Sequence, residues 1–275
     1  MSGVDLHTHT TASDGTYAPA ELVREAVRRG VRVLAVTDHD SVEAVAPALL
    51  AAREHPPLEI VPGIEINTDG PQGEIHVLGF FLDHEAGWLR DLLREFRAER
   101  LARVHRIAER LATLGHPIDP EEVFALVQEG SAGRPHVAQV MVRRGYVGTV
   151  REAFDRFLAA GKPAYVPHRK VVPREACEII RRAGGLAVVA HPGFHEDPER
   201  MVRELAGTGQ LDGVECYYAE HSPEQTARLL ALCRELDLAP TGGSDFHGPK
   251  VRAATLGLPP VPWEAWEALR RRAGR

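Results

Sequence analysis

The stretch "VDLHTHTTASDG", residues 4–15, places His7, His9 and Asp14 directly after a short apolar run near the amino terminus. On a β-strand, residues two positions apart point to the same side, so both imidazoles can reach one point. Neutral imidazoles that converge on a point usually bind a metal ion. A lone His-x-His pair also occurs in solvated loops, so the rest of the chain has to distinguish these two interpretations.

Length and composition are those of an ordinary globular protein. The chain has 275 residues, of which 44% are hydrophobic and 26% are charged. This is enough for one large α/β domain or for one domain with an insertion. No apolar run approaches the roughly 18 residues that span a bilayer, and no signal-peptide pattern is present, so we expect a cytoplasmic protein without a membrane partner. Cys177, Cys216 and Cys233 lack the spacing of disulfides or thiolate zinc sites and are expected to be buried.

Charge is unevenly distributed along the chain. The formal net charge is −6 at pH 7, but residues 85–171 contain 15 Lys and Arg against 11 Asp and Glu, which gives this stretch +4 and the remainder −10. The acidic remainder suits a cation, and the basic stretch suits an anion.

Short apolar runs that alternate with helical patterns predict a parallel sheet, open or closed into a barrel. Strands are expected in VRVLAVT (from 31), LEIVPGIEI (from 58), EIHVLGFFL (from 74), GLAVVA (from 185) and GVECYY (from 213). Helical patterns occupy 19–29, 41–54, 172–183 and 222–237. The sequence DSVE at 40–43 is typical of a capping box, with Asp40 as the N-cap and Glu43 three residues later.

Residues 87–160 interrupt this alternation. Apolar residues from Leu89 to Leu114 recur at helical spacing, and shorter helices are expected at 120–129, 135–144 and 149–160. We predict an inserted helical subdomain at 87–160 within a barrel domain formed by 1–86 and 161–275. An arginine stripe on the first helix is interpreted as a solvated face rather than a nucleic-acid groove. It comprises Arg90, Arg94, Arg97, Arg103, Arg106 and Arg110.

More candidate metal ligands follow the other predicted strands. Each has an ordinary interpretation when taken alone, as a core histidine, a surface carboxylate or a strand terminator. Chance is a much weaker explanation for the whole set, because residues at the carboxyl ends of barrel strands converge on one mouth. Imidazole and carboxylate without thiolate suit manganese, iron, zinc or cobalt, and nine ligands exceed what one ion can use. The nine are His7, His9, Asp14, His39, Glu65, His76, His191, Asp245 and His247.

This set, with TDHD at 37–40, AHPG at 190–193 and GSDFHG at 243–248, resembles the PHP (polymerase and histidinol phosphatase) family of metal-dependent phosphoesterases. The resemblance runs over nearly the whole chain and implies a distorted seven-stranded (β/α) barrel. It also implies two or three divalent ions, with manganese expected and iron or zinc as alternatives. One ion would be bound by His7, His9, Glu65 and Asp245, a second by Glu65, His76 and His191, and a third by Asp14, His39 and His247.

The helical insert, GKPAYVP at 161–167 and GVECYYAEHSPEQ at 213–225 are similar to the branch of this family that acts on nucleoside 3',5'-bisphosphates and trims RNA from its 5' end. Arg134 and Lys162, in the basic insert, would bind a phosphate, and ordinary surface charge is the alternative interpretation. His195 and His221 are candidates for the general acid or for a contact to the substrate phosphate.

Other catalytic templates do not match. The sequence has no P-loop, no H-E-x-x-H pair and no complete nucleophile elbow. We therefore expect a metal-dependent hydrolase that binds a nucleotide bisphosphate or short single-stranded RNA and needs no protein partner. Two alternatives stay open. One is a histidinol-phosphate phosphatase, which has no need of a basic insert, and the other is a nucleic-acid-binding accessory module with structural metals.

Overall fold

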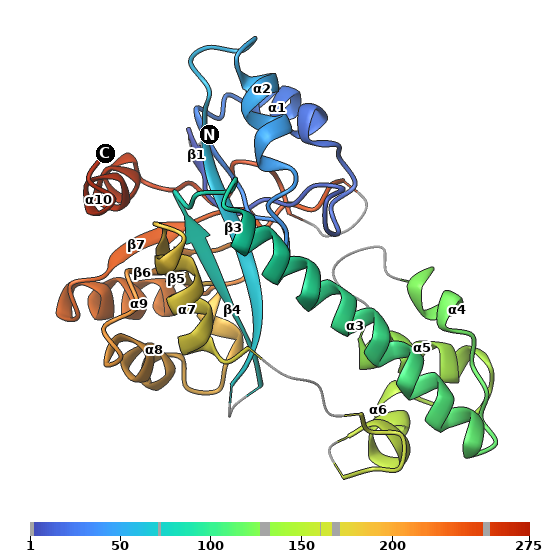
Figure 1. The fold of residues 1–275 in the computed structure, drawn as a ribbon. Helices are drawn as coiled ribbons and strands as arrows, with labels where there is room; N and C mark the ends of the chain where they lie inside the picture. Colours follow the sequence, from blue (N-terminus) through green and yellow to red (C-terminus); the bar gives the residue numbers. More distant parts are fainter. Residues whose placement is uncertain (1–2, 71–72, 127–132, 160, 167–170, 250–253) are drawn as a thin grey trace. The chain divides into compact units, whose positions relative to one another are not determined.

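The structure, a computed structural model, describes residues 3–70, 73–126, 133–159, 161–166, 171–249 and 254–275. The chain divides into two compact units, residues 1–91 with 170–275 and residues 92–169. The first unit contains the sheet and its helices, and the second is helical (Figure 1). The division at 92 falls inside a helix that begins at Gly87, and residue 160 of the expected boundary lies outside the described residues.

One mixed sheet forms the first unit, and its strands follow one another in sequence order. They are β1 (Val4–Asp5), β2 (Val33–Val36), β3 (Glu59–Gly70), β4 (Gly73–Phe80), β5 (Leu186–Val189), β6 (Gly213–Tyr217) and β7 (Ala239–Gly242). Neighbours are parallel except that β4 is antiparallel to both β3 and β5. Beyond the first and last strands, Thr8 bridges Phe246 and the Leu6 amide donates to Gly242 O at 3.2 Å. The sheet is thereby nearly closed, and the predicted distorted barrel is confirmed.

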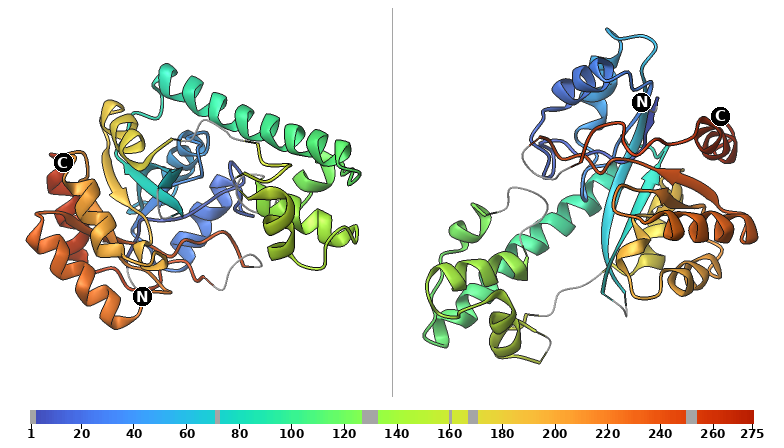
Figure 2. Two further views of the ribbon diagram at one scale, coloured as in Figure 1. Left: turned by 90° about the horizontal axis from the view of Figure 1, so that it is seen from below. Right: turned by 180° about the vertical axis from the view of Figure 1, so that it is seen from behind.

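Helices cover the outside of this sheet (Figure 2). They are α1 (Pro19–Arg28), α2 (Val45–Ala52), α7 (Pro173–Arg182), α8 (Pro198–Ala206), α9 (Pro223–Glu235) and α10 (Trp263–Arg272). The patterns at 19–29, 172–183 and 222–237 correctly predicted α1, α7 and α9. The sequence analysis missed α8, α10 and β7, whose sequence APTG has no apolar run.

Trp266 on α10 is the largest side chain in the core of the barrel unit. It is 1% exposed and packs in one cluster with strand residues that include Val33, Leu78 and Val188. Trp263, one turn earlier on the same helix, is 37% exposed. The two tryptophans therefore differ in burial while sharing a helix.

Trp266→Ala is expected to lower the free energy of unfolding by about 3–5 kcal/mol, because it removes buried apolar surface and leaves a cavity. Trp263→Ala is the matched control and should cost far less. Urea denaturation followed by circular dichroism measures both. Equal losses from the two substitutions would contradict the role of Trp266 in the core.

The second unit is built on α3 (Gly87–Thr113), followed by α4 (Pro120–Phe124), α5 (Arg134–Arg143) and α6 (Val150–Ala153), which continues into a π-helical turn at Phe154–Leu158. It has its own buried core, which includes Ile107, Leu111 and Met141. The expected helices at 135–144 and 149–160 agree with these elements to within one or two residues at each end, whereas α4 ends at Phe124, earlier than the expected 120–129, and residues 125–126 form a turn; residues 127–129 and 160 lie outside the described residues.

Two local predictions were wrong. Asp40 is not a helix cap, because α2 begins at Val45 with Ala44 as its N-cap. The positive φ of 45° at Asp40 turns the chain, and its carboxylate accepts from the Asn67 amide at 3.3 Å. In the arginine stripe, Arg103 is not solvated: it is 9% exposed, and its Nε donates to Val166 O at 3.0 Å.

Within the described residues, no helix combines the length and apolar character needed to cross a membrane. The three cysteines are free and buried, as predicted.

Candidate metal centre

The nine predicted ligands lie in one cluster of the barrel unit. His7 and His9 follow β1, and His39 follows β2. His191 follows β5, while Asp245 and His247 follow β7. These positions agree with the expectation that ligands come from strand ends.

Glu65 and His76 depart from that expectation, because both lie inside strands. β2 pairs with β3 only as far as Pro62, and beyond this point β3 continues in an antiparallel pair with β4. In that register Asn67 is opposite His76, so Glu65 and His76 point to the same face. The extended β3–β4 pair therefore brings both side chains to the cluster, with His76 Nδ1 2.9 Å from Glu65 Oε1.

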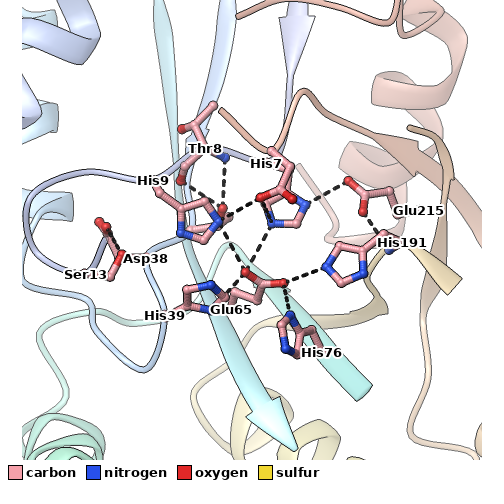
Figure 3. A network of polar contacts seen from close by, with 12 residues as sticks. His7, Thr8, His9, Ser13, Asp38, His39, Glu65, His76, His191 and Glu215 are labelled. Atoms are coloured by element: carbon pink, nitrogen blue, oxygen red, sulfur yellow. Dashed lines mark hydrogen bonds and ion pairs between the residues drawn. The ribbon is translucent and has the colours of Figure 1, made fainter. Parts of the chain in front are cut away.

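Glu65 lies at the centre of five imidazoles (Figure 3). Its Oε1 is close to two of them, at 2.9 Å from His76 Nδ1 and 3.2 Å from His191 Nε2. Its Oε2 is close to three more, at 3.2 Å from His7 Nε2, 3.3 Å from His9 Nε2 and 3.1 Å from His39 Nδ1. A carboxylate with this many neighbours can bridge two ions.

Asp14 is the centre of a second group. Its Oδ1 lies 3.2 Å from His9 Nδ1, and its Oδ2 lies 3.4 Å from His39 Nε2 and 3.1 Å from His247 Nε2. Asp245 Oδ1 faces His7 and His9 at 3.4 and 3.2 Å. All of these side chains are buried or nearly so.

Three sets of side chains place their ligand atoms within 4.8 Å of one another. They are His7, His9, Glu65 and Asp245; His9, Asp14, His39 and His247; and His39, Glu65 and His76. The first is one expected set, and the second is another with His9 added. In the third, His39 stands where His191 was expected.

Several buried atoms of this cluster lack a hydrogen bond, which fits a site that binds metal ions. In the described part of the chain, buried atoms without a hydrogen-bond partner include His7 Nε2, both ring nitrogens of His9, His39 Nδ1 and Glu65 Oε2. A buried polar atom without a partner costs free energy, and native proteins rarely leave several together. Divalent cations would satisfy these nitrogen and oxygen atoms.

The pKa values of the cluster reflect burial and close opposite charges. Burial raises the pKa of Glu65, but neighbouring His39, His7 and His76 hold it well below its usual range. Burial lowers the pKa of His76, yet the carboxylates of Glu65 and Glu74 together outweigh this effect and raise it to about 10. At His39 burial dominates and lowers the pKa to about 3, which favours the neutral imidazole that a metal ligand requires.

Four residues that the sequence analysis missed support the ligands. Asp38 accepts from the Thr10 amide at 2.7 Å, and Asp5 accepts from the Ser244 amide at 2.9 Å. Tyr218 donates its hydroxyl to Asp245 Oδ2 at 3.0 Å. Glu215 contacts the His7 ring and the His191 amide. A charged residue within the apolar strand GVECYY is the signal that could have identified Glu215.

A pocket of about 360 Å³ opens onto the cluster and is lined in part by Glu74, Phe194 and His195. Burial and the charges of His191 and His76 lower the pKa of His195. His221 is not among the described residues that line the pocket. Its Nδ1 donates to Cys216 O at 3.1 Å, and its Nε2 accepts from the Gly193 amide at 3.1 Å. Both ring nitrogens are therefore hydrogen-bonded to backbone groups.

Arg134 and Lys162 lie in the second unit, and both contact residues of the stretch 154–165. Arg134 Nη1 donates to Leu158 O at 3.3 Å, and its guanidinium lies over the rings of Phe154 and Tyr165, 5.7 and 5.6 Å from their centroids. Lys162 is exposed, and its backbone carbonyl accepts from the Tyr165 amide at 3.0 Å.

Comparison with known proteins adds four findings. The family described as "PHP domain" matches residues 5–156. The 5'-3' exoribonuclease Rnm of Escherichia coli is 36% identical over 89% of this chain and 85% of its own length. The 3',5'-nucleoside bisphosphate phosphatase of Chromobacterium violaceum is 29% identical over 99% of this chain and 98% of its own. A solved structure from Bifidobacterium adolescentis, described as a metal-dependent phosphoesterase, superposes with a TM-score of 0.74, 33% identity and 98% of each chain covered.

Proposed function

The chain belongs to the PHP domain family, and we propose that it removes the 3'-phosphate of nucleoside 3',5'-bisphosphates and trims short 5'-phosphorylated RNA from its 5' end. The observation that carries this proposal is the cluster of imidazoles and carboxylates around Glu65, which has the donor atoms of a multinuclear metal site. The bisphosphate phosphatase and exoribonuclease relatives each match over more than four-fifths of this chain, at 99% and 89%.

The eight side chains of the three ligand sets, with His191 beside Glu65, would hold two or three divalent ions, which we propose to be manganese, with iron or zinc as alternatives. When bound, such ions lower the pKa of a water molecule and neutralise charge on phosphoryl oxygens. Glu65 and Asp14 fix the spacing of the surrounding imidazoles. Asp38 and Asp5 accept hydrogen bonds from the Thr10 and Ser244 amides and so hold two of the loops that carry the proposed ligands.

The leaving 3'-oxygen needs a proton, because an alkoxide is a poor leaving group. His195 lines the pocket, and we assign it this proton transfer. We assign His221 a positioning role, since its ring holds the Gly193 amide in the turn that precedes His195.

The 5'-phosphate, which does not react, is assigned to Arg134 and Lys162. The Arg134 guanidinium lies over two aromatic rings, which limits its orientation, and a guanidinium can bind a phosphate through two parallel hydrogen bonds. Binding energy from this anchor orients the reacting phosphate.

One active-site geometry serves both substrates. The 3'-phosphate of a bisphosphate and the first linkage of a 5'-phosphorylated RNA are attacked at the same phosphorus, and both reactions release a 5'-mononucleotide. The two activities therefore require no second catalytic site.

A phosphate-release screen with Mn²⁺ tests this proposal. Adenosine 3',5'-bisphosphate should be hydrolysed fastest, with 3'-AMP and histidinol phosphate slower by about tenfold or more, because only the bisphosphate presents both phosphates. Chelation of the metal should abolish turnover. Faster hydrolysis of histidinol phosphate would instead indicate a histidinol-phosphate phosphatase. Activity after exhaustive chelation would contradict the metal mechanism.

A further inference from the structure

Strand β6 provides none of the nine proposed ligands, yet it carries a carboxylate that contacts two of them. Glu215 is fully buried. Its Oε1 lies 3.0 Å from His7 Nδ1, and its Oε2 accepts from the His191 backbone amide at 2.7 Å (Figure 3). His7 follows β1 and His191 follows β5, so this one side chain joins two parts of the cluster that are far apart in the sequence.

The two ring nitrogens of His7 have different surroundings. Nε2 faces Glu65 Oε2 at 3.2 Å and Asp245 Oδ1 at 3.4 Å, and it has no hydrogen-bond partner in the described part of the chain. In the described part of the chain, Nδ1 forms its ion pair with Glu215, at 3.0 Å from Oε1. The geometry leaves Nε2 for an ion and requires that Nδ1 carry the proton, which it donates to Glu215.

The contact to His191 acts on the backbone. His191 has φ 26° and ψ 55°, a left-handed conformation that is unfavourable for a residue with a side chain. The short hydrogen bond from its amide to Glu215 holds this conformation, which directs the ring toward Glu65.

Both partners of Glu215 are N–H donors, and this determines the side chain that the position accepts. A carboxylate offers an acceptor at each oxygen, whereas glutamine offers one acceptor and one donor. Whichever way a glutamine amide is turned, its NH₂ group would face a donor. Aspartate keeps two acceptors but is shorter by one methylene.

We propose that Glu215 is a positioning residue for metal binding, which sets the His7 tautomer and the His191 backbone through its two oxygens. We do not count it as a ligand, because each of its oxygens already faces an N–H group, that of His7 Nδ1 and that of the His191 amide. The inference rests on the proposed metal sites. Residues of this kind typically contribute about 10- to 100-fold to metal affinity.

Equilibrium dialysis against Mn²⁺, followed by elemental analysis, measures affinity and stoichiometry for Glu215→Gln and a control. Asp212→Asn is the matched control: Asp212 is also buried and accepts from a backbone amide, that of Ala187, and from a side chain, that of Arg181, but it contacts no proposed ligand. Glu215→Gln should weaken Mn²⁺ binding by about 10- to 100-fold. Asp212→Asn should bind Mn²⁺ as the wild type does.

A folded Glu215→Gln protein with wild-type affinity would overturn the inference while leaving the proposed function intact. If this variant does not fold, the His7 tautomer can be tested in the wild-type protein loaded with diamagnetic Zn²⁺. Long-range ¹H–¹⁵N correlation spectra should show the His7 proton on Nδ1, and a ring without a proton on Nδ1 would overturn the inference. A wild-type protein that binds neither metal would instead overturn the proposed function, and this inference with it.

Discussion

Glu65→Gln is expected to lower kcat by roughly 10³-fold or more and to release at least one metal ion from a protein that stays folded. The reason is its position: two carboxylate oxygens face five imidazoles, at 2.9 to 3.3 Å. Glutamine has the same size but carries no charge and presents only one oxygen. A loss of about 4 kcal/mol of transition-state stabilisation corresponds to about 10³ in rate.

Glu74→Gln is a suitable control for this experiment, because it makes the same change of charge at the rim of the same pocket. Its side chain is 63% exposed, and its Oε1 is 3.7 Å from His76 Nε2. We expect a loss of less than about tenfold, as is typical of exposed charges. Full metal content and activity in Glu65→Gln would show that the cluster is not organised around this carboxylate.

The second large effect concerns substrate recognition. Arg134→Ala should lower kcat/KM for adenosine 3',5'-bisphosphate by about 10- to 100-fold, since a hydrogen bond to a charged group contributes roughly 1.5–3 kcal/mol. Hydrolysis of 3'-AMP, which has no 5'-phosphate, should hardly change. Steady-state kinetics on both substrates separates this effect from general damage.

Arg151→Ala provides the comparison within the same helical unit, because its side chain is 92% exposed. Arg151→Ala should leave kcat/KM unchanged for both substrates. If Arg134→Ala lowered kcat/KM equally for the two substrates, the 5'-phosphate would have to bind elsewhere.

The chemistry-bearing residues could be predicted because their signals are local. His-x-His after a short apolar run, TDHD, and GSDFHG each place ring nitrogens or carboxylates after a strand, and the comparisons confirmed the family that these motifs indicated. Glu215 was missed although it is a charged residue within the apolar run GVECYY, and Tyr218 offers no such signal, because a buried hydroxyl becomes meaningful only when its partner is known. Asp38 lies within TDHD, but the sequence does not show that it accepts from Thr10.

The fold class was predicted correctly, but the direction of β4 was not. Strict alternation of strand and helix predicts parallel neighbours, yet β3 ends at Gly70 and β4 begins at Gly73, which leaves no room for a crossover helix. Turn-forming residues between two strand patterns indicate a hairpin, and DGPQG at 69–73 is such a signal. The antiparallel pair is what places Glu65 and His76 in mid-strand on one face.

Identification of the products from adenosine 3',5'-bisphosphate is the most direct test of the proposed reaction. Chromatography with mass detection, in the presence of Mn²⁺, should show 5'-AMP and one equivalent of phosphate, with the 5'-AMP persisting after the substrate is exhausted. The same reaction with chelator should show unchanged substrate. Formation of 3'-AMP, or further conversion of 5'-AMP to adenosine, would contradict the assignment of the 3'-phosphate to the cluster around Glu65.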